Sequence, residues 1–294
     1  MNYYNEIKTK LIDNEIYCKV KDYSKEKNTV TTYYEIGKLL SEAGKHYGQN
    51  IINEYSKKLS IEVGKKYNIT ILKRMRQFYY FIQKGAPLAH QLSWSHYVEL
   101  LPIKNMNEIE YYINQSIDLN LSRNELRSKI KNKEYERLPE KTKNKLVNKE
   151  KTKVEDLIKN PILIKNKNNY EVISEKILQR LILEDIESFM KELGNSFSFI
   201  GSEYKTKMGS TYNYIDLLLY NIEFNCYIVL ELKVTELKKE YIGQIEVYMN
   251  YIDNTLKKPT QNKTIGIIIC KKNNKYIIEY CSDKRIISKE YVLV

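Results

Sequence analysis

The chain has 294 residues, with 49 Lys and Arg against 37 Asp and Glu, which gives a formal net charge of +12. Its hydrophobic content of 42% suits one large globular domain or two ordinary ones. No apolar run approaches the roughly 18 residues that a membrane span needs. The first residues are polar and show no signal peptide. These features argue against membrane-spanning and secreted classes.

The composition also bears on partners. The positive surplus favours polyanions such as nucleic acid, through Coulomb attraction and counterion release, although a merely basic soluble protein has the same charge. The four Cys include no CxxC pair and the three His have no metal-ligand spacing, so we expect a cytoplasmic protein without a disulfide framework. Tyr is abundant, with 27 residues. A coding bias explains most of them, but some could stack on bases.

Residues 1–132 have the pattern of an all-α domain. In "TVTTYYEIGKLLSEAG" a capping box at Thr32 and Glu35 predicts the start of a helix. The segments "NIINEYSKKLSIEVG", "LSWSHYVELLPI" and "SRNELRSKIKNKEYERL" continue the helical spacing. Ser95 and Ser122 are the expected caps of the last two.

A basic helix is predicted for "NITILKRMRQFYYFIQKG", starting at Thr70. Its apolar residues recur at helical spacing and predict one buried face, formed by Ile71, Met75, Phe78 and Ile82. Lys73, Arg74 and Arg76 then project from the other faces. These three side chains could contact phosphates, and a solvated basic face is the alternative.

Residues 133–170 differ in composition from both neighbours. The segment is rich in Lys and Asn and has few apolar anchors, as in "EKTKNKLVNKEKTKVEDLIKNPILIKNKNNY". Such a composition predicts a solvated linker between two domains. A path along nucleic acid is the alternative.

Residues 171–294 have an α/β pattern. One long amphipathic helix is expected for "EVISEKILQRLILEDIESFMKELG", followed by a strand in "SFSFIGSEYKTK". A second helix is expected for "LKKEYIGQIEVYMNYIDN", and "KTIGIIICKK" should be a buried strand. "KYIIEYC" and "SKEYVLV" are expected as edge strands.

Charged residues occur in an otherwise apolar hairpin, "YIDLLLYNIEFNCYIVLELK". We expect strands over 212–220 and 226–233, joined by a short polar turn. Alternation places Glu231 and Lys233 on one face of the second strand. The midpoint between Asp216 and Glu231 falls in the turn, so the two carboxylates should be opposed, with Cβ atoms roughly 4.5–5.5 Å apart.

Two carboxylates this close repel each other unless one takes a proton or a cation joins them. Mg²⁺ accepts one or two carboxylates together with water and phosphate oxygens. The backbone carbonyl of Leu232 is a further candidate ligand, and Lys233 could contact the scissile phosphate or orient the attacking water. The set predicts metal-assisted phosphodiester hydrolysis. The pattern D-x(14)-E-x-K is loose, and a solvated sheet edge is the alternative.

The order of helix, strand, Asp-bearing strand, turn, E-x-K strand and helix resembles the PD-(D/E)XK nuclease superfamily. "FMKELGNSFSFIG", "YIDLLLYN", "CYIVLELKVTELKKEYIGQIEVYMNYID" and "TIGIIIC" resemble the nuclease domain of the bacterial YhcG-like proteins. "YYEIGKLLSE", "LSWSHYVELL" and "LRSKIKNKEYERL" resemble their N-terminal domain. The resemblance implies a multidomain α+β chain. It would combine an all-α, winged-helix-like domain with a restriction-endonuclease-like α/β domain that has a central mixed sheet.

The resemblance also implies roles for particular residues. Asp216 and Glu231 would bind metal, with the carbonyl of Leu232, and Lys233 would be catalytic. Gln244 would be the Gln that the superfamily often places in the next helix, against the substrate or the active site. Tyr248 shares its helix face and could contact nucleic acid or pack in the core. The implied cofactor is Mg²⁺, with Mn²⁺ as a substitute, and the implied partner is DNA.

The chain departs from its relatives at several positions. Ser202 and Glu203 follow the glycine where relatives tend to read G-R-Q, so a phosphate contact could be weaker, or Glu203 could join the acidic cluster. Gln179 stands where relatives often carry an acid. Glu175 or Glu187 could take its place, which leaves a second metal site open.

Together these features predict a cytoplasmic, Mg²⁺-dependent DNA endonuclease acting in restriction, recombination, repair or mobile-element defence. The N-terminal domain would recognise DNA or bind a partner, including a second copy of the chain. Two alternatives remain. One is a non-catalytic nucleic-acid-binding protein that keeps the fold, and the other is an assembly subunit of a larger DNA-processing complex.

Overall fold

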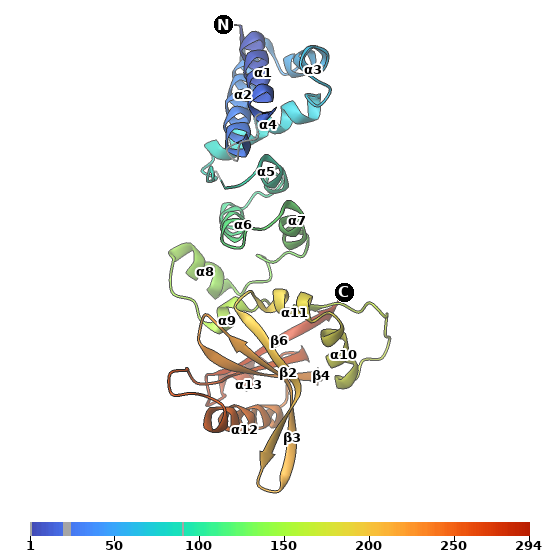
Figure 1. Ribbon diagram of the computed structural model, residues 1–294, viewed down its shortest axis with the longest axis vertical. Coiled ribbons are helices and arrows are strands. Elements are labelled where there is room, and N and C mark those ends of the chain that lie inside the picture. The colour runs from blue at the N-terminus through green and yellow to red at the C-terminus, as the bar shows by residue number, and fades with distance from the viewer. Residues whose placement is uncertain (1, 20–24, 90) are drawn as a thin grey trace. The chain divides into compact units, whose positions relative to one another are not determined.

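The computed structural model describes residues 2–19, 25–89 and 91–294 (Figure 1). One of the three His, His90, therefore lies outside the described residues. The chain divides into two compact units, Met1–Tyr135 and Glu136–Val294. No helix in the described ranges combines the length and the apolar character needed to cross a bilayer.

The first unit consists of helices. They are α1 (Tyr3–Lys19), α2 (Lys25–Tyr47), α3 (Ile51–Glu62), α4 (Ile69–Gln83), α5 (Trp94–Leu100), α6 (Met106–Asp118) and α7 (Arg123–Lys131). The helical expectation is confirmed. The strands that a wing would require do not occur among residues 2–19, 25–89 and 91–135.

The cap of helix α4 lies two residues earlier than predicted, at Asn68 in place of Thr70. The side chain of Asn68 caps it by accepting hydrogen bonds from the backbone N–H groups of Thr70 and Ile71, at 3.0 and 3.2 Å. Because the buried face has shifted, Leu72 and Phe81 are buried beside the expected Met75 and Phe78. Asn is as good a cap as Thr, so the pattern alone did not separate them.

Other helix starts test the predicted caps. Ser122 caps α7 as predicted, in a reciprocal box with Glu125. Helix α5 instead begins after Ser93, not Ser95. Thr32 lies inside α2, which already begins at Lys25. The helix start predicted at Thr32 was therefore wrong, because polar residues on the surface of a helix can have the same spacing as a capping box.

The second unit is built on a six-stranded mixed sheet with strand order β1-β6-β5-β4-β3-β2. The strands are β1 (Ile162–Ile164), β2 (Phe197–Met208), β3 (Thr211–Asn221), β4 (Cys226–Glu236), β5 (Ile265–Lys272) and β6 (Ile286–Leu293). β2, β3 and β4 are antiparallel neighbours, and the remaining pairs are parallel. The expected central mixed sheet is confirmed.

Helices cover both faces of this sheet. They are α8 (Glu140–Asn148), α9 (Val154–Leu157), α10 (Glu175–Glu184), α11 (Ile186–Leu193), α12 (Lys239–Thr255) and α13 (Lys275–Glu279). One face forms the α12 core, with Leu218, Val229 and Ile268 against Ile245, Met249 and Ile252. The other forms the α10–α11 core, with Leu217, Leu230 and Leu232 against Leu178, Leu181 and Phe189.

The segment 133–170 is not a solvated linker. It contains α8, α9 and β1, and Val154, Ile158 and Ile162 are buried in the α10–α11 core. β1 pairs in parallel with β6, with Ile162 opposite Tyr291. A few apolar residues of this Lys-rich segment were enough to attach it, because Val154, Ile158 and Ile162 are at most 2% exposed.

Three further expectations for this unit were wrong. The long helix is divided at Asp185, whose side chain accepts the backbone N–H of Ser188 at 3.3 Å and caps α11. Residues 275–281 form the short helix α13 and a turn instead of a strand. β6 is not an edge strand either, because it lies between β1 and β5.

Candidate active site

The candidate site lies where β3 and β4 stop pairing. The antiparallel ladder runs from the turn as far as the pair Leu217–Leu230. Beyond this point β3 continues beside β2, and β4 continues beside β5. One further step in the same register places Asp216 opposite Glu231, as the count about the turn predicts. We call this divergence of the two strands the fork.

The backbone of β3 is irregular at Asp216. Ile215 packs in the α12 core, whereas Leu217 packs in the α10–α11 core. Residues two apart share a face in a regular strand, so the strand rotates at Asp216. Beside it in β2, Glu203 has a φ of 46°, in the left-handed region. The Asp216 side chain reaches across the fork, and its Oδ2 accepts the backbone N–H of Leu232 at 2.7 Å.

Glu231 makes the complementary contact from β4. Its side chain is 2% exposed, and its Oε1 accepts the backbone N–H of Asp216 at 3.4 Å. Its other oxygen, Oε2, accepts from Lys233 Nζ at 3.3 Å. Each strand therefore holds the other's carboxylate through a backbone N–H. The remaining oxygen of Asp216, Oδ1, accepts no hydrogen bond from the residues that the structure describes.

The site has an excess of buried negative charge. Burial raises the pKa of Glu231 to about 7, and the carboxylate of Asp216 adds to this rise. Burial also raises the pKa of Asp216, although the hydrogen bond from Leu232 and the charge of Lys233 oppose it. Glu175 and Glu203 raise the pKa of Asp216 further. Additional positive charge at this place would relieve the repulsion.

Lys233 supplies one positive charge. It is 6% exposed, lies 3.6 Å from the Oε2 of Glu175, and has its Nζ 5.1 Å from the ring centroid of Tyr241 in α12. Burial alone would lower the pKa of Lys233, but the carboxylates of Glu231, Glu175 and Asp216 raise it above its usual value. Lys233 is thus held as a charged ammonium.

Helix α10 contributes two residues. Gln179 is buried, and its Nε2 donates to the backbone carbonyl of Asp216 at 3.0 Å. Glu175, one turn earlier, reaches Lys233. The other candidate acid, Glu187, is instead exposed and pairs with Lys191 at 2.7 Å. The family resemblance marked Gln179 as a departure, but its role could not be inferred from sequence because it depends on a contact with a distant strand.

Gln244 and Tyr248 lie together on α12. Gln244 Nε2 donates to the Tyr248 hydroxyl at 3.3 Å, and no described contact joins Gln244 to Asp216, Glu231 or Lys233. Tyr248 is 6% exposed and belongs to the α12 core, which favours the packing alternative. Another residue of α12, Tyr241, one turn before Gln244, does contact the site through Lys233, and the sequence pattern did not single it out.

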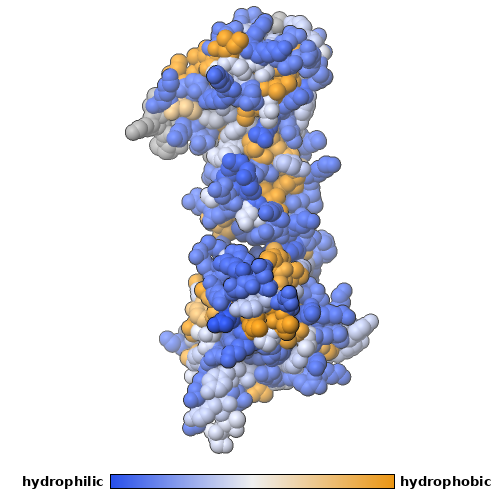
Figure 2. All heavy atoms as spheres, turned by 90° about the vertical axis from the view of Figure 1, so that its right-hand side faces the viewer, coloured by the Kyte–Doolittle hydropathy of each residue, from blue (hydrophilic) through white to orange (hydrophobic). Residues whose placement is uncertain are grey.

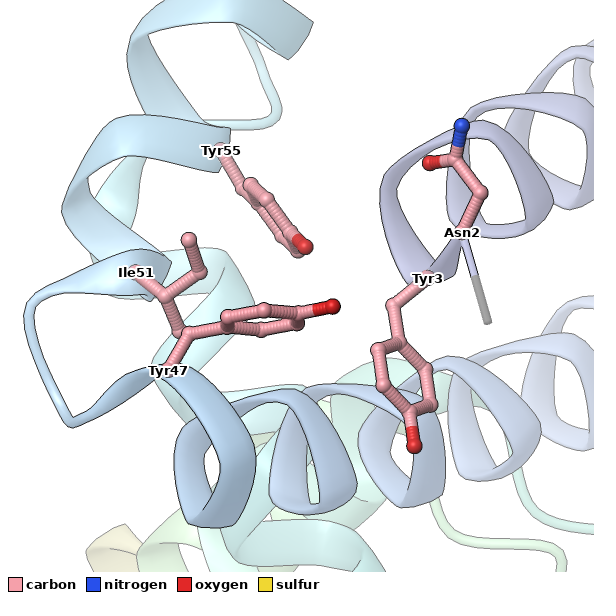
Figure 3. A pocket seen from close by; sticks show the side chains of 5 residues that line it. All are labelled: Asn2, Tyr3, Tyr47, Ile51 and Tyr55. Carbon is pink, nitrogen blue, oxygen red and sulfur yellow. The ribbon is translucent and has the colours of Figure 1, made fainter.

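The predicted basic residues of the first unit lie on α4. Lys73 and Arg74 are exposed, whereas Arg76 is half-buried and donates to Gln49. The same unit has a hollow lined by Asn2, Tyr3, Tyr47, Ile51 and Tyr55 (Figure 3). This hollow holds none of the predicted residues and has no carboxylate or imidazole in its lining, so it lacks the side chains that most often bind metal ions.

The donors at the fork suit a hard cation. The described ranges contain no group of three or more His, Cys, Asp and Glu that could hold a metal. Mg²⁺ does not need one, since it binds through one or two carboxylates and keeps several waters. Asp216 and Glu231 supply the carboxylates. The side chain of Leu232 is buried in the α10–α11 core, so only its main chain can contribute.

Comparisons with known proteins show which families the two parts of the chain match. Residues 155–293 match the family model of the YhcG PDDEXK nuclease domain, and residues 16–137 match that of the DUF1016 N-terminal domain. The nuclease-domain match takes in β1, in agreement with the sheet. The chain is 24% identical over 286 residues to "Putative nuclease YhcG" of Escherichia coli (strain K12), covering 81% of this chain and 76% of that protein.

Two solved structures are also similar. One is the "crystal structure of a repair endonuclease from Pyrococcus abyssi", with a TM-score of 0.30 and 17% identity over 42% of this chain and 48% of that one. The other is the "Structure of EndoMS-dsDNA2 complex", with a TM-score of 0.29 and 18% identity over 43% of this chain and 48% of that one. Each match spans about half the length of the solved chain.

Proposed function

Because residues 155–293 form a YhcG-type PDDEXK nuclease domain, we propose that this protein is an endonuclease that hydrolyses phosphodiester bonds in DNA with a divalent cation. Mg²⁺ is the expected ion, and Mn²⁺ could replace it. One observation carries the proposal. The carboxylates of Asp216 and Glu231 are held together at the fork by two backbone N–H groups, with the Lys233 ammonium 3.3 Å from Glu231.

The residues at the fork would have different roles in the reaction. Asp216 and Glu231, with the carbonyl of Leu232, would hold the cation. When bound, it would polarise a phosphoryl oxygen and lower the pKa of a water molecule. Lys233 is kept protonated, so it acts as a charge and not as a base. Its ammonium would stabilise the negative charge that develops as water adds to phosphorus and the P–O bond to the leaving alcohol breaks.

Gln179 and Glu175 act as positioning residues. Gln179 fixes the backbone at Asp216 through the carbonyl, and Glu175 orients the ammonium of Lys233. Gln244 completes the proposed set as a substrate contact from α12. The N-terminal unit is proposed to recognise DNA or to bind a partner, a second copy of the chain included. The exposed Lys73 and Arg74 support a role at phosphates.

The test is a cleavage assay on linear, nicked, branched and single-stranded DNA and on RNA, each with Mg²⁺, Mn²⁺ or EDTA. We expect wild-type protein to cut DNA with either metal and not with EDTA, and Glu231→Gln protein to cut nothing. The Gln side chain keeps the shape of the site and removes only the charge. Cleavage by the Glu231→Gln protein at the wild-type rate would disprove the assignment. DNA binding without cleavage under every condition would favour the non-catalytic alternative.

A further inference from the structure

Strands β2 and β3 stay paired beyond the fork and form a hairpin arm, residues 204–215, at the lower end of Figure 1. Two of its cross-strand pairs are Lys205 with Tyr214 and Lys207 with Tyr212. Directly opposed residues share a face of the hairpin, so these four side chains lie on one face, which we call the outer face.

The inner face of the arm is attached to the rest of the unit. Thr206 is fully buried, and Tyr204 and Met208 pack against the α12 core. The backbone N–H of Lys207 donates to the hydroxyl of Tyr251 in α12 at 3.3 Å. These contacts account for the inner face and leave the outer face without a packing role.

The outer face combines positive charge with exposed rings. Tyr212 and Tyr214 are 50% and 53% exposed, and both lysines are exposed. Lys205 Nζ lies 3.9 Å from the ring centroid of Tyr212. The arm contains no Asp or Glu. In Figure 2 the arm is pale to blue, without an orange patch. The positive charges and exposed rings of the outer face therefore suit a negatively charged ligand that contains flat rings better than an apolar partner.

The outer face begins beside the carboxylates. Strands rise about 3.4 Å per residue, so the two Lys–Tyr pairs lie roughly 7 and 14 Å along β3 from Asp216. Stacked nucleotides also advance about 3.4 Å each. The spacing of the two pairs therefore matches nucleotides that lie roughly two and four positions from the phosphodiester bond to be cut.

We propose that the outer face of the arm binds an unpaired nucleic-acid strand next to the cut, with Lys205 and Lys207 at phosphates and Tyr212 and Tyr214 stacked on bases. A duplex presents base edges in its grooves, whereas an unpaired strand offers ring faces, which aromatic side chains beside basic ones bind without sequence preference. The inference rests on the proposed function, because it takes the fork as the position of the cut.

The experiment measures binding without cleavage, so that it does not depend on the enzyme assay. Full-length Glu231→Gln protein in EDTA is titrated into a fluorescein-labelled single-stranded DNA oligonucleotide, its duplex and a forked duplex, with anisotropy as readout. The test variants add Y212L/Y214L or K205A/K207A. The controls add Y276L/Y280L, two exposed tyrosines in α13 and at its C-cap, or K258A/K263A, two exposed lysines of the loop after α12.

We expect Y212L/Y214L to weaken binding to the single-stranded oligonucleotide and to the forked duplex at least about fivefold for each ring removed. Binding to the fully paired duplex should weaken much less. Y212F/Y214F should keep wild-type affinity, because the rings remain. K205A/K207A should reduce the dependence of log affinity on log salt by about 1.4, since each phosphate contact to a single strand contributes about 0.7. The control pairs should change neither.

Unchanged single-strand affinity in Y212L/Y214L, or an equal loss on duplex and single strand, would overturn the proposal. Circular dichroism of each variant shows whether the hairpin and sheet remain folded, and the lysine pair gives a second test if the tyrosine pair unfolds. Failure of the arm proposal leaves cleavage by wild-type protein intact. Failure of the nuclease proposal leaves this binding result interpretable.

Discussion

Asp216 and Leu232 lie across the fork from each other, and the aspartate Oδ2 accepts the leucine backbone N–H at 2.7 Å. One side chain thus has two tasks. It closes a backbone hydrogen-bonding position that the divergence of β3 and β4 leaves open, and it presents a carboxylate to the site.

The two tasks can be separated by substitution. We expect Asp216→Asn and Asp216→Ala both to lose cleavage, by at least about a hundredfold. Only Asp216→Ala leaves the buried N–H of Leu232 unpaired, and it should lower the free energy of unfolding by about 1–3 kcal/mol. The Asn amide oxygen can still accept that N–H and should cost less. Urea unfolding of both variants in EDTA measures the difference, and equal stabilities would contradict it.

Metal binding should be visible as stability. A ligand that binds only the folded state stabilises it, by about 2.7 kcal/mol at a hundred times its Kd. We expect Mg²⁺ to raise the Tm of the wild-type protein, because it relieves the repulsion between Asp216 and Glu231. Glu231→Gln should abolish the increase. A scan by differential scanning fluorimetry with and without Mg²⁺ tests this, and an undiminished increase in Glu231→Gln would place the bound ion elsewhere.

Gln179 should influence the metal without touching it. Gln179→Met keeps a similar volume but removes the donor to the Asp216 carbonyl, so the carboxylate loses its fixed position. We expect the Mg²⁺ concentration for half-maximal cleavage to rise roughly tenfold, as for other residues that orient metal ligands. Glu187→Gln, an exposed change on α11, is the control and should behave as wild type. An unaltered Mg²⁺ requirement in Gln179→Met would leave Gln179 with a packing role only.

The limits of the nuclease unit can be tested by truncation. A fragment 136–294 should fold cooperatively, whereas 171–294 should not, because it lacks β1 and the ion pair of Arg137 with Glu192. Glu192 also accepts the backbone N–H of Leu163 at 3.0 Å. Glu192→Ala in the full chain removes one partner from this buried set and should cost about 3–5 kcal/mol. Thermal unfolding followed by circular dichroism measures both, and a cooperative 171–294 fragment would restore the linker assignment.

Acid should release the contacts of Asp156. Burial alone would raise its pKa, but hydrogen bonds from Lys145 and from the backbone N–H of Lys153 lower it below the usual 3.8. Because the folded-state pKa is the lower one, the stabilisation is complete above the unfolded value and is lost as pH falls through the folded value. Asp156→Asn should therefore lose about 1–3 kcal/mol near neutral pH. The difference in free energy of unfolding between Asp156→Asn and wild type should become smaller in acid. Urea unfolding at several pH values measures it, and a difference that does not change with pH would contradict the prediction.

The hairpin that carries the site was accessible from sequence for a physical reason. A short polar turn between two apolar strands fixes the register of a hairpin, so the count about the turn sets Asp216 opposite Glu231. Gln179 was different, since its bond to Asp216 joins residues 37 positions apart. Nothing in a local pattern reports such a contact.

The same distinction explains the errors elsewhere. The helical periodicity around Asp185 continues through the break, and only the capping bond of its side chain reveals two helices. β1 has three residues in a Lys-rich segment, so its signal was too short to stand out from a linker. Whether β6 is central or at an edge depends on β1, and strand order of this kind is set by non-local pairing.

The order of the strands has a consequence for protein synthesis. β6 is the partner of both β5 and β1, but of the six strands of this sheet it comes last in chain order. The β3–β4 hairpin joins neighbours and can form within microseconds, yet an isolated hairpin is only marginally stable in water. A nascent chain that lacks β6 therefore has the acidic residues on an incomplete sheet. Of these six strands, the last to be translated is the one that completes the sheet on which the site is built.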